Sequence, residues 1–274
     1  MEGRNHAMKP GILVISHGSR EAAWVQLVDE AVAAAAASPR LSGVPIMSSF
    51  LEIVEGRLIQ DGIDELEGQG VTDMFVVPLF VSSGSTHVDE IGQAFGFPWV
   101  SDLEGDLGTF RVKATIHYGL PIDDDPQIAE LLASNIAPLS TRPESEALLL
   151  IGHGSKEKVF HERWQEGLKK LGERVRGLGG YKRAEYAMLL PDQAAGKLAA
   201  MQAANPQEAV IVVPLFLSQG YFTNHVIPNR LNGFVYRYNG KTMLPNAAIE
   251  QWLEHQMIDG LQRLCEEKHV TFTE

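Results

Sequence analysis

The chain has 274 residues, of which 45% are hydrophobic and 21% are charged, as in globular proteins long enough for two α/β domains. Its formal net charge of −12 excludes a general nucleic-acid binder, which needs a basic face. The single cysteine, Cys265, excludes an internal disulfide and a cysteine zinc cluster. We expect a cytoplasmic protein, because the sequence lacks the apolar core of a signal peptide and a run long enough to span a membrane.

The first half alternates short β-rich apolar runs with longer helical patterns. The predicted strands cover 11–16, 44–50, 74–80 and 111–116, and the predicted helices cover 21–37 and 53–68. This order is typical of a parallel sheet built from βαβ crossovers.

The second half repeats that order after a proline-rich linker at 138–145. Its predicted strands cover 147–151, 183–189 and 209–216, and its predicted helices cover 157–176 and 192–204. We therefore place two domains at 1–140 and 141–274. Residues 102–110 are interpreted as a surface loop, and the aspartates at 123–125 as the N-cap of a helix that starts near Gln127.

Two sequence phrases occur twice. A hydrophobic strand runs into His-Gly-Ser at His17 and again at His153, and a Val-Val-Pro-Leu-Phe phrase occurs around Pro78 and again around Pro214. Both pairs are separated by 136 residues. A common offset for two phrases indicates a duplicated domain. The predicted fold class is α/β, with two similar domains that are each a parallel sheet flanked by helices.

Three candidate functional residues follow three predicted strands of the first half. His17 follows the first strand, Glu52 the second and His87 the third. Ligands of open parallel sheets bind outside the carboxyl ends of the strands, so these side chains are expected at one edge of the sheet. A His/Glu/His trio suits a divalent late first-row metal ion. It also suits proton transfer.

The second half carries an imperfect copy of this trio. His153 matches His17, and His225 lies near the position that corresponds to His87. Leu190 stands where the first half has Glu52. We predict one working site in the first half and a degenerate copy in the second. The residues leave open whether His153 and His225 form a second site.

At these motifs the chain resembles the CbiX/SirB family of sirohydrochlorin chelatases, class II chelatases, in its long two-domain form. The resemblance covers nearly the whole chain and rests on the order and spacing of His17-Gly18-Ser19-Arg20, Phe50-Leu51-Glu52, Val77-Pro78-Leu79-Phe80, Gly84 and His87. It implies a chelatase-like fold and a lyase-class activity. That activity is insertion of Co²⁺ or Fe²⁺ into sirohydrochlorin, in cobalamin or siroheme biosynthesis.

The resemblance also implies residue roles. His17 and His87 would hold the metal ion and take protons from pyrrole nitrogens, while Glu52 would complete the metal site or pass protons to solvent. Ile53 follows Glu52 where related sequences often have proline, so Glu55 is a second candidate carboxylate. The residues expected to bind the tetrapyrrole are Ser19, Arg20, Ser82, Ser83 and Gly84.

The expected partners are therefore sirohydrochlorin and a divalent metal ion, with no cofactor beyond that ion. We expect no nucleic acid and no membrane as partners. A monomer is expected, because the duplication already supplies two lobes.

Two other functions are alternatives to this one. Phosphoryl transfer on the His-Gly loop is disfavoured, because histidine phosphatases place arginine directly before the nucleophile, whereas Ser16 and Gly152 occupy those places here. A metal or tetrapyrrole carrier would use the same ligands without turnover. The sequence leaves the choice between carrier and chelatase open.

Overall fold

A computed structural model describes residues 8–267 and divides them into two compact units. The first unit comprises 8–79, 90–121 and 250–267, and the second comprises 80–89 and 122–249. The units are thus interleaved in sequence. Residues 80–89 of the first half are grouped with the second unit, and residues 250–267 of the second half are grouped with the first unit. The domain boundary expected at residue 140 separates the two copies of the sequence repeat, and it stays a prediction.

The first unit is built on a four-stranded parallel sheet of order β2-β1-β3-β4. Its strands are β1 (Pro10–Ser16), β2 (Ile46–Phe50), β3 (Asp73–Pro78) and β4 (Thr115–Tyr118). The central strand β1 is fully buried from Ile12 to Ile15. A parallel strand that is covered on both faces needs apolar side chains on both. Its sequence is therefore a continuous apolar run rather than an alternation of apolar and polar residues.

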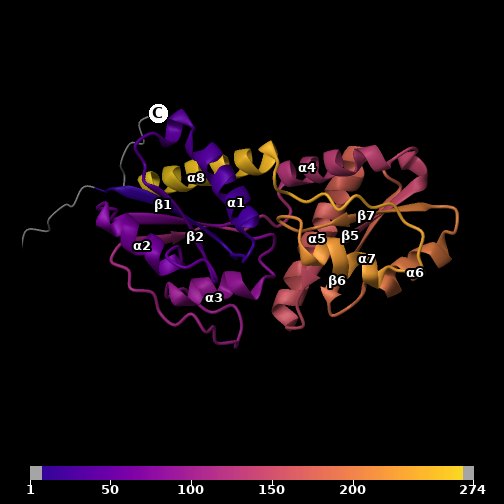
Figure 1. The fold of residues 1–274 in the computed structure, drawn as a ribbon, viewed down its shortest axis with the longest axis horizontal. Helices are drawn as coiled ribbons and strands as arrows, with labels where there is room; N and C mark the ends of the chain where they lie inside the picture. Colours follow the sequence, from indigo (N-terminus) through magenta and orange to yellow (C-terminus); the bar gives the residue numbers. More distant parts are fainter. Residues whose placement is uncertain (1–7, 268–274) are drawn as a thin grey trace, which may run out of the picture. The chain divides into compact units, whose positions relative to one another are not determined.

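Helices cover both faces of this sheet (Figure 1). They are α1 (Ala22–Ala36), α2 (Ile59–Gly68), α3 (Thr86–Ala94) and α8 (Ala247–Glu267), with a short 3₁₀ turn η1 (Pro39–Leu41) after α1. In Figure 1, α1 and α8 lie above the strands and α2 and α3 lie below them. Gly260 of α8 packs so closely on the Phe75 ring of β3 that a Cβ there would overlap the ring.

The second unit has a three-stranded parallel sheet of order β6-β5-β7. Its strands are β5 (Glu146–Gly154), β6 (Arg183–Leu190) and β7 (Ala209–Pro214). The order matches β2-β1-β3 of the first unit, as expected for a duplicated domain. In place of a fourth strand, a single bridge joins Ile211 to Arg237.

The helices of the second unit include α4 (Pro126–Ile136), which packs on α5 (Lys158–Gly179), and α6 (Ala194–Ala204), which packs on α7 (Ile227–Arg230). Short 3₁₀ turns η2 (Ala137–Leu139) and η3 (Pro143–Ser145) precede β5, and a π-helical turn η4 (Phe222–Val226) precedes α7. In the part of the chain that the structure describes, no helix is both long and apolar enough to cross a bilayer.

The predicted elements are largely confirmed, with three differences. The helix expected over 53–68 begins only at Ile59, because Ile53 and Gly56 have φ of 73° and 74°, outside the helical region. The strand expected at 111–116 is β4, which starts at Thr115. The expected elements include no helix at the positions of α3, α7 and α8. The expected N-cap is confirmed, since the Asp125 side chain accepts a 2.8 Å hydrogen bond from Gln127 N.

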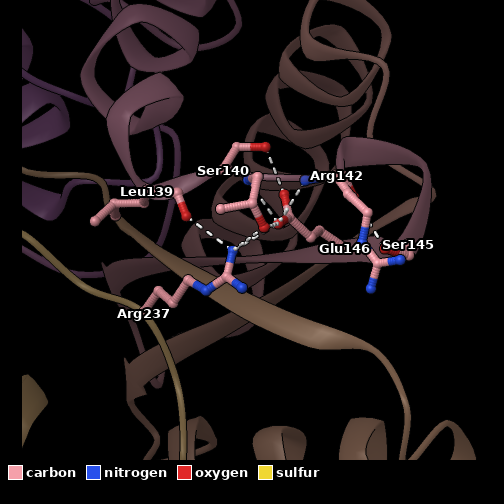
Figure 2. Close-up of polar contacts among 7 residues, drawn as sticks. Leu139, Ser140, Arg142, Ser145, Glu146 and Arg237 are labelled. Carbon is pink, nitrogen blue, oxygen red and sulfur yellow. Dashed lines mark hydrogen bonds and ion pairs between the residues drawn. The ribbon is translucent and has the colours of Figure 1, made fainter.

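A buried carboxylate fastens the linker to the start of β5 (Figure 2). Glu146 is 1% exposed and accepts hydrogen bonds from the Ser140 hydroxyl and the backbone N–H groups of Thr141 and Arg142. The Arg237 guanidinium donates to the same carboxylate and to the Leu139 carbonyl, at 2.9 Å for the latter. Burial alone raises the pKa of Glu146, but these hydrogen bonds outweigh it and lower the pKa from 4.5 to about 2.

Glu146 is therefore expected to stabilise the fold in a pH-dependent way. Because its folded pKa lies below the unfolded value, its contribution is complete above pH 4.5 and is lost as the pH falls towards 2. Glu146→Gln should lower the free energy of unfolding by about 2 to 3 kcal/mol at pH 7. Urea unfolding between pH 7 and pH 3 measures this, and the difference from wild type should shrink with acid. The exposed Glu144→Gln is the matched control; an equal loss in both variants would contradict the assignment.

Candidate functional site

The His-Gly-Ser turn of the first unit, residues 17–19, follows β1 directly. His17 Nδ1 lies 3.2 Å from the Gly18 carbonyl oxygen, and Ser19 Oγ accepts a 3.1 Å hydrogen bond from Glu21 N. When Nδ1 donates to that carbonyl, Nε2 of the neutral ring carries the lone pair. The turn thus presents His17 Nε2 outwards at the carboxyl end of the strand.

The end of β2 brings Glu52 to this turn. Leu51 N donates to the Ser16 carbonyl at 2.8 Å, and Glu52 N donates to the His17 carbonyl at 3.2 Å. His17 Nε2 and Glu52 Oε1 are 3.7 Å apart. Their side chains are 42% and 54% exposed, so both are open to a ligand and to solvent.

Gly18 makes this approach possible. Its φ of 103° disfavours any residue with a Cβ, and a Cβ at this position would overlap the Glu52 carbonyl oxygen. The main chain after Glu52 is also constrained, because Ile53 holds a φ of 73° that a β-branched residue rarely adopts. The two loops therefore fix each other, and with them the His17–Glu52 pair.

Two further charged residues, Arg57 and Glu55, lie close to Glu52 in the sequence. Arg57, a basic residue near Glu52, donates two 2.7 Å hydrogen bonds to Asp29 and one of 3.0 Å to the Ser48 carbonyl, and its guanidinium lies over the Phe50 ring. It stabilises the loop, and nothing in the sequence pattern indicated its partner Asp29. Glu55 is exposed, and the carboxylate that lies 3.7 Å from His17 Nε2 is that of Glu52.

The segment that follows β3 is grouped with the second unit. Ser83 N and Oγ donate to Asp123 Oδ1 at 2.7 and 3.0 Å, and Ser82 Oγ accepts from Gly84 N at 2.9 Å. A Cβ at Gly84 would lie 2.5 Å from the Trp164 ring. Both hydroxyls are thus engaged within the protein, and the tetrapyrrole contacts expected of this segment stay predictions.

Of the predicted site residues, the structure brings His17 and Glu52 together. Ser19 lies in the same turn, and Arg20 beside it is exposed. His87 lies in the first turn of α3 and belongs to the segment grouped with the second unit, so its part in the site stays a prediction. Within residues 8–267, no group of three or more His, Cys, Asp or Glu side chains is arranged to hold a metal ion.

The second unit repeats the backbone of the turn. His153 Nδ1 lies 3.0 Å from the Gly154 carbonyl, and Ser155 Oγ accepts a 3.2 Å hydrogen bond from Glu157 N. Gly154 has φ of 83°, and a Cβ there would overlap the Leu190 carbonyl oxygen, as at Gly18 and Glu52. The structure therefore aligns Leu190 with Glu52. The second copy keeps the histidine and lacks the carboxylate.

The His17–Glu52 pair has the chemistry of a metal and proton site. An imidazole nitrogen and a carboxylate are suitable ligands for Fe²⁺ or Co²⁺, and imidazole exchanges protons near neutral pH. The hydrogen bond at Nδ1 orients the ring, as in many histidine metal ligands.

Most of the chain matches the profile of one known protein family. The profile of the CbiX family matches residues 11–139 and 147–258, which is most of both halves. The chain belongs to the CbiX family. No curated protein matched the chain.

Solved structures share the fold. SirB from Bacillus subtilis with Fe³⁺ has a TM-score of 0.72 at 19% identity, and the match covers 97% of this chain and 100% of that one. The sirohydrochlorin chelatase SirB from Bacillus subtilis subspecies spizizenii in complex with cobalt has a TM-score of 0.66, with the same identity and coverage. CbiX, described as the terminal enzyme of siroheme biosynthesis in denitrifying bacteria, has a TM-score of 0.55 at 17% identity, covering 92% and 98%.

A substitution at Gly18 tests whether its close contact with the Glu52 carbonyl holds the His17–Glu52 pair in place. Gly18→Ala should lower the free energy of unfolding by about 2 to 4 kcal/mol, because both the left-handed φ and the Glu52 carbonyl oppose a Cβ. Gly43→Ala is the matched control, with φ of 78° and no atom within 4 Å. Thermal or urea unfolding of the two variants gives the comparison. Equal losses would show that the contact with Glu52 contributes nothing beyond backbone strain.

Proposed function

We propose that the protein is a sirohydrochlorin chelatase that inserts Co²⁺ or Fe²⁺ into the tetrapyrrole. The observation that carries this proposal is the His17–Glu52 pair at the carboxyl ends of β1 and β2 in a chain of the CbiX family. The solved relatives named as SirB support it, since they were obtained with Fe³⁺ and with cobalt, and one is called a sirohydrochlorin chelatase.

Insertion requires a partly desolvated metal ion and the loss of two pyrrole protons for each divalent ion. In the proposed mechanism, His17 Nε2 and a Glu52 oxygen replace part of the hydration shell of the ion, and His87 is the third predicted ligand. The metal ion is a substrate, so the site must release it to the macrocycle. A site with few protein ligands, half open to solvent, suits such a transfer.

The protons leave through the same side chains. Imidazole is a common general base in enzymes, so we propose that His87, or His17 once it has released the ion, accepts a pyrrole proton. Glu52, with its side chain 54% exposed, then relays the proton to water. The net reaction exchanges one divalent ion for two protons and consumes no other reagent, so no cofactor beyond the substrate metal is proposed.

The proposal covers both metal ions and both biosynthetic pathways. Imidazole and carboxylate ligands accept both Fe²⁺ and Co²⁺, so the siroheme and cobalamin pathways fit equally. We further propose a cytoplasmic monomer without nucleic-acid or membrane partners. This rests on the net charge of −12, on the single buried cysteine and on the duplicated domain.

A carrier that binds the metal or the tetrapyrrole without turnover is the alternative. The rate of metal insertion distinguishes such a carrier from a chelatase. With sirohydrochlorin and Co²⁺ under anaerobic conditions, the absorbance change with wild-type protein should be much faster than without protein. Binding of both ligands without any acceleration would favour the carrier.

The two candidate carboxylates make a matched pair for testing the site. Glu52→Gln should lower the insertion rate by about 100-fold, because it removes a metal ligand and proton acceptor while leaving the loop unchanged in size. Glu55→Gln, three residues further on and also exposed, should retain nearly the wild-type rate. The anaerobic absorbance assay measures both variants. A loss confined to Glu55→Gln would transfer the carboxylate role to Glu55.

A further inference from the structure

A pocket lies along the outer edge of the second sheet. The strand β6 is an edge strand of the order β6-β5-β7, and both α5 and α6 pack on it. The pocket between these three elements has a volume of about 380 Å³. Sites for small molecules occupy roughly 300 to 1,000 Å³. The wall of the pocket includes two residues of α5, two of β6 and two at or near the start of α6, namely His161, Gln165, Tyr186, Met188, Gln193 and Lys197.

The first copy closes the corresponding edge with an ion pair. Arg57, which precedes α2, lies over the Phe50 ring of β2 and donates two 2.7 Å hydrogen bonds to Asp29 of α1. A Cβ at the turn glycine would meet Phe50 in the first copy and Met188 in the second, so these two residues are equivalent. Gln165 lies 136 residues after Asp29, and α5 begins 136 residues after α1. The second copy therefore has a neutral amide in place of the carboxylate that holds Arg57.

Two neutral side chains of this pocket are oriented as hydrogen-bond donors. Gln165 Nε2 donates a 2.7 Å hydrogen bond to the Tyr186 hydroxyl. Because the hydroxyl oxygen accepts this bond, its own hydrogen remains to be donated. Gln193 Oε1 accepts a 3.0 Å hydrogen bond from Met188 N, so the amide nitrogen of Gln193 keeps its two hydrogens for other acceptors. The pocket thus offers a hydroxyl and an amide to an acceptor group.

Lys197 supplies the positive charge of the pocket. Its Nζ lies 3.2 Å from Glu185, and Glu185 also pairs with Arg183 at 3.5 Å. Glu208 in turn pairs with Arg183 at 2.7 Å and with Lys182 at 3.2 Å. Three cations share two carboxylates in this chain of ion pairs, which leaves one net positive charge. The Lys197 side chain is 36% exposed, so its ammonium group has access to a further anion.

The remaining wall is suited to a small organic body. The Tyr186 ring and the Met188 side chain provide apolar surface, and the His161 ring is held by Nδ1, which lies 3.0 Å from the Ser155 carbonyl oxygen. One ammonium group with neutral donors matches the single charge of a carboxylate. A phosphate group carries nearly two charges at pH 7 and is usually bound by several cations.

We propose that this pocket binds a small carboxylic acid with an apolar body. Its carboxylate accepts hydrogen bonds from Lys197, the Tyr186 hydroxyl and the Gln193 amide. The site belongs entirely to the second unit. Metal insertion as proposed above uses none of its residues, so the two proposals are tested separately.

The test is an NMR titration of the ¹⁵N-labelled full chain with benzoate, and with benzamide as its neutral counterpart of the same shape. Benzoate should shift amide resonances of α5, β6 and α6, and benzamide should bind about tenfold more weakly, because a hydrogen bond to a charged group is lost. Lys197→Met keeps the length of the side chain. It should raise the Kd for benzoate about tenfold and leave that for benzamide unchanged.

Lys158→Met is the matched control for the lysine. Lys158 is 87% exposed on α5 and lies 3.9 Å from Glu162, so it is also a paired surface lysine of the second unit. This variant should bind benzoate as wild type does. Equal losses in Lys158→Met and Lys197→Met would show a general effect of charge, which overturns the site.

Tyr186→Phe is a second variant, which covers the case in which Lys197→Met does not fold. It removes the hydroxyl and should raise the Kd for benzoate about fivefold. Tyr221→Phe, which removes the hydroxyl of a 70% exposed tyrosine of the same unit, is its control and should have no effect.

Three results would overturn the inference. The first is wild-type protein whose α5, β6 and α6 resonances do not respond to benzoate. The second is benzoate binding that is unchanged in both pocket variants, since the ligand then lies elsewhere. The third is tighter binding of inorganic phosphate than of benzoate in this pocket, which would exclude a carboxylate as the preferred ligand.

Discussion

The site depends on the contact between a glycine in the left-handed region and the carbonyl that ends the neighbouring strand. At Gly18 this contact brings the main chain of Glu52 against the turn after β1, so that His17 and Glu52 stand 3.7 Å apart. The same contact occurs at Gly154 and Leu190. Because it involves only backbone atoms and a missing Cβ, it survived the duplication while the side chains around it changed.

This constraint explains how the two copies keep the same turn while the side chain beside it differs. The parallel sheet places the ends of its strands at one edge, and the glycine turn fixes the histidine there in both copies. What differs is the residue that follows the second strand, a carboxylate at Glu52 and an apolar side chain at Leu190. The second half as a degenerate copy stays a prediction, which the loss of the carboxylate at Leu190 supports.

Much of the fold could be predicted from the sequence, because buried parallel strands require continuous apolar runs and the repeated phrases mark equivalent positions. The His17–Glu52 pair was also predictable, since His17 directly follows β1 and Glu52 lies two residues after the end of β2. The start of α2 was not, because the left-handed Ile53 has no sequence signature. The helix α8 did leave a signal in the sequence, since Trp252, Leu253, Met257 and Leu261 are buried at helical spacing, although no helix is among the predicted elements there.

Other features depend on partners distant in the sequence and were not predictable. Arg57 is fixed by Asp29, and Ser83 by Asp123, 40 residues away. Glu146 and Arg237 are 91 residues apart, yet together they fasten the linker to the second sheet. Polar pairs of this kind carry no periodic pattern, so only the folded chain reveals which candidate side chains are engaged within the protein.

The proposed function requires a single metal site, which lies in the first copy. Its most direct test is the stoichiometry of Co²⁺ binding, measured by anaerobic titration calorimetry with the visible Co²⁺ absorption as a second readout. We expect one bound ion per chain, with binding lost in His17→Ala and retained with unchanged affinity in His153→Ala. Two ions per chain, or binding that survives His17→Ala and disappears in His153→Ala, would contradict it.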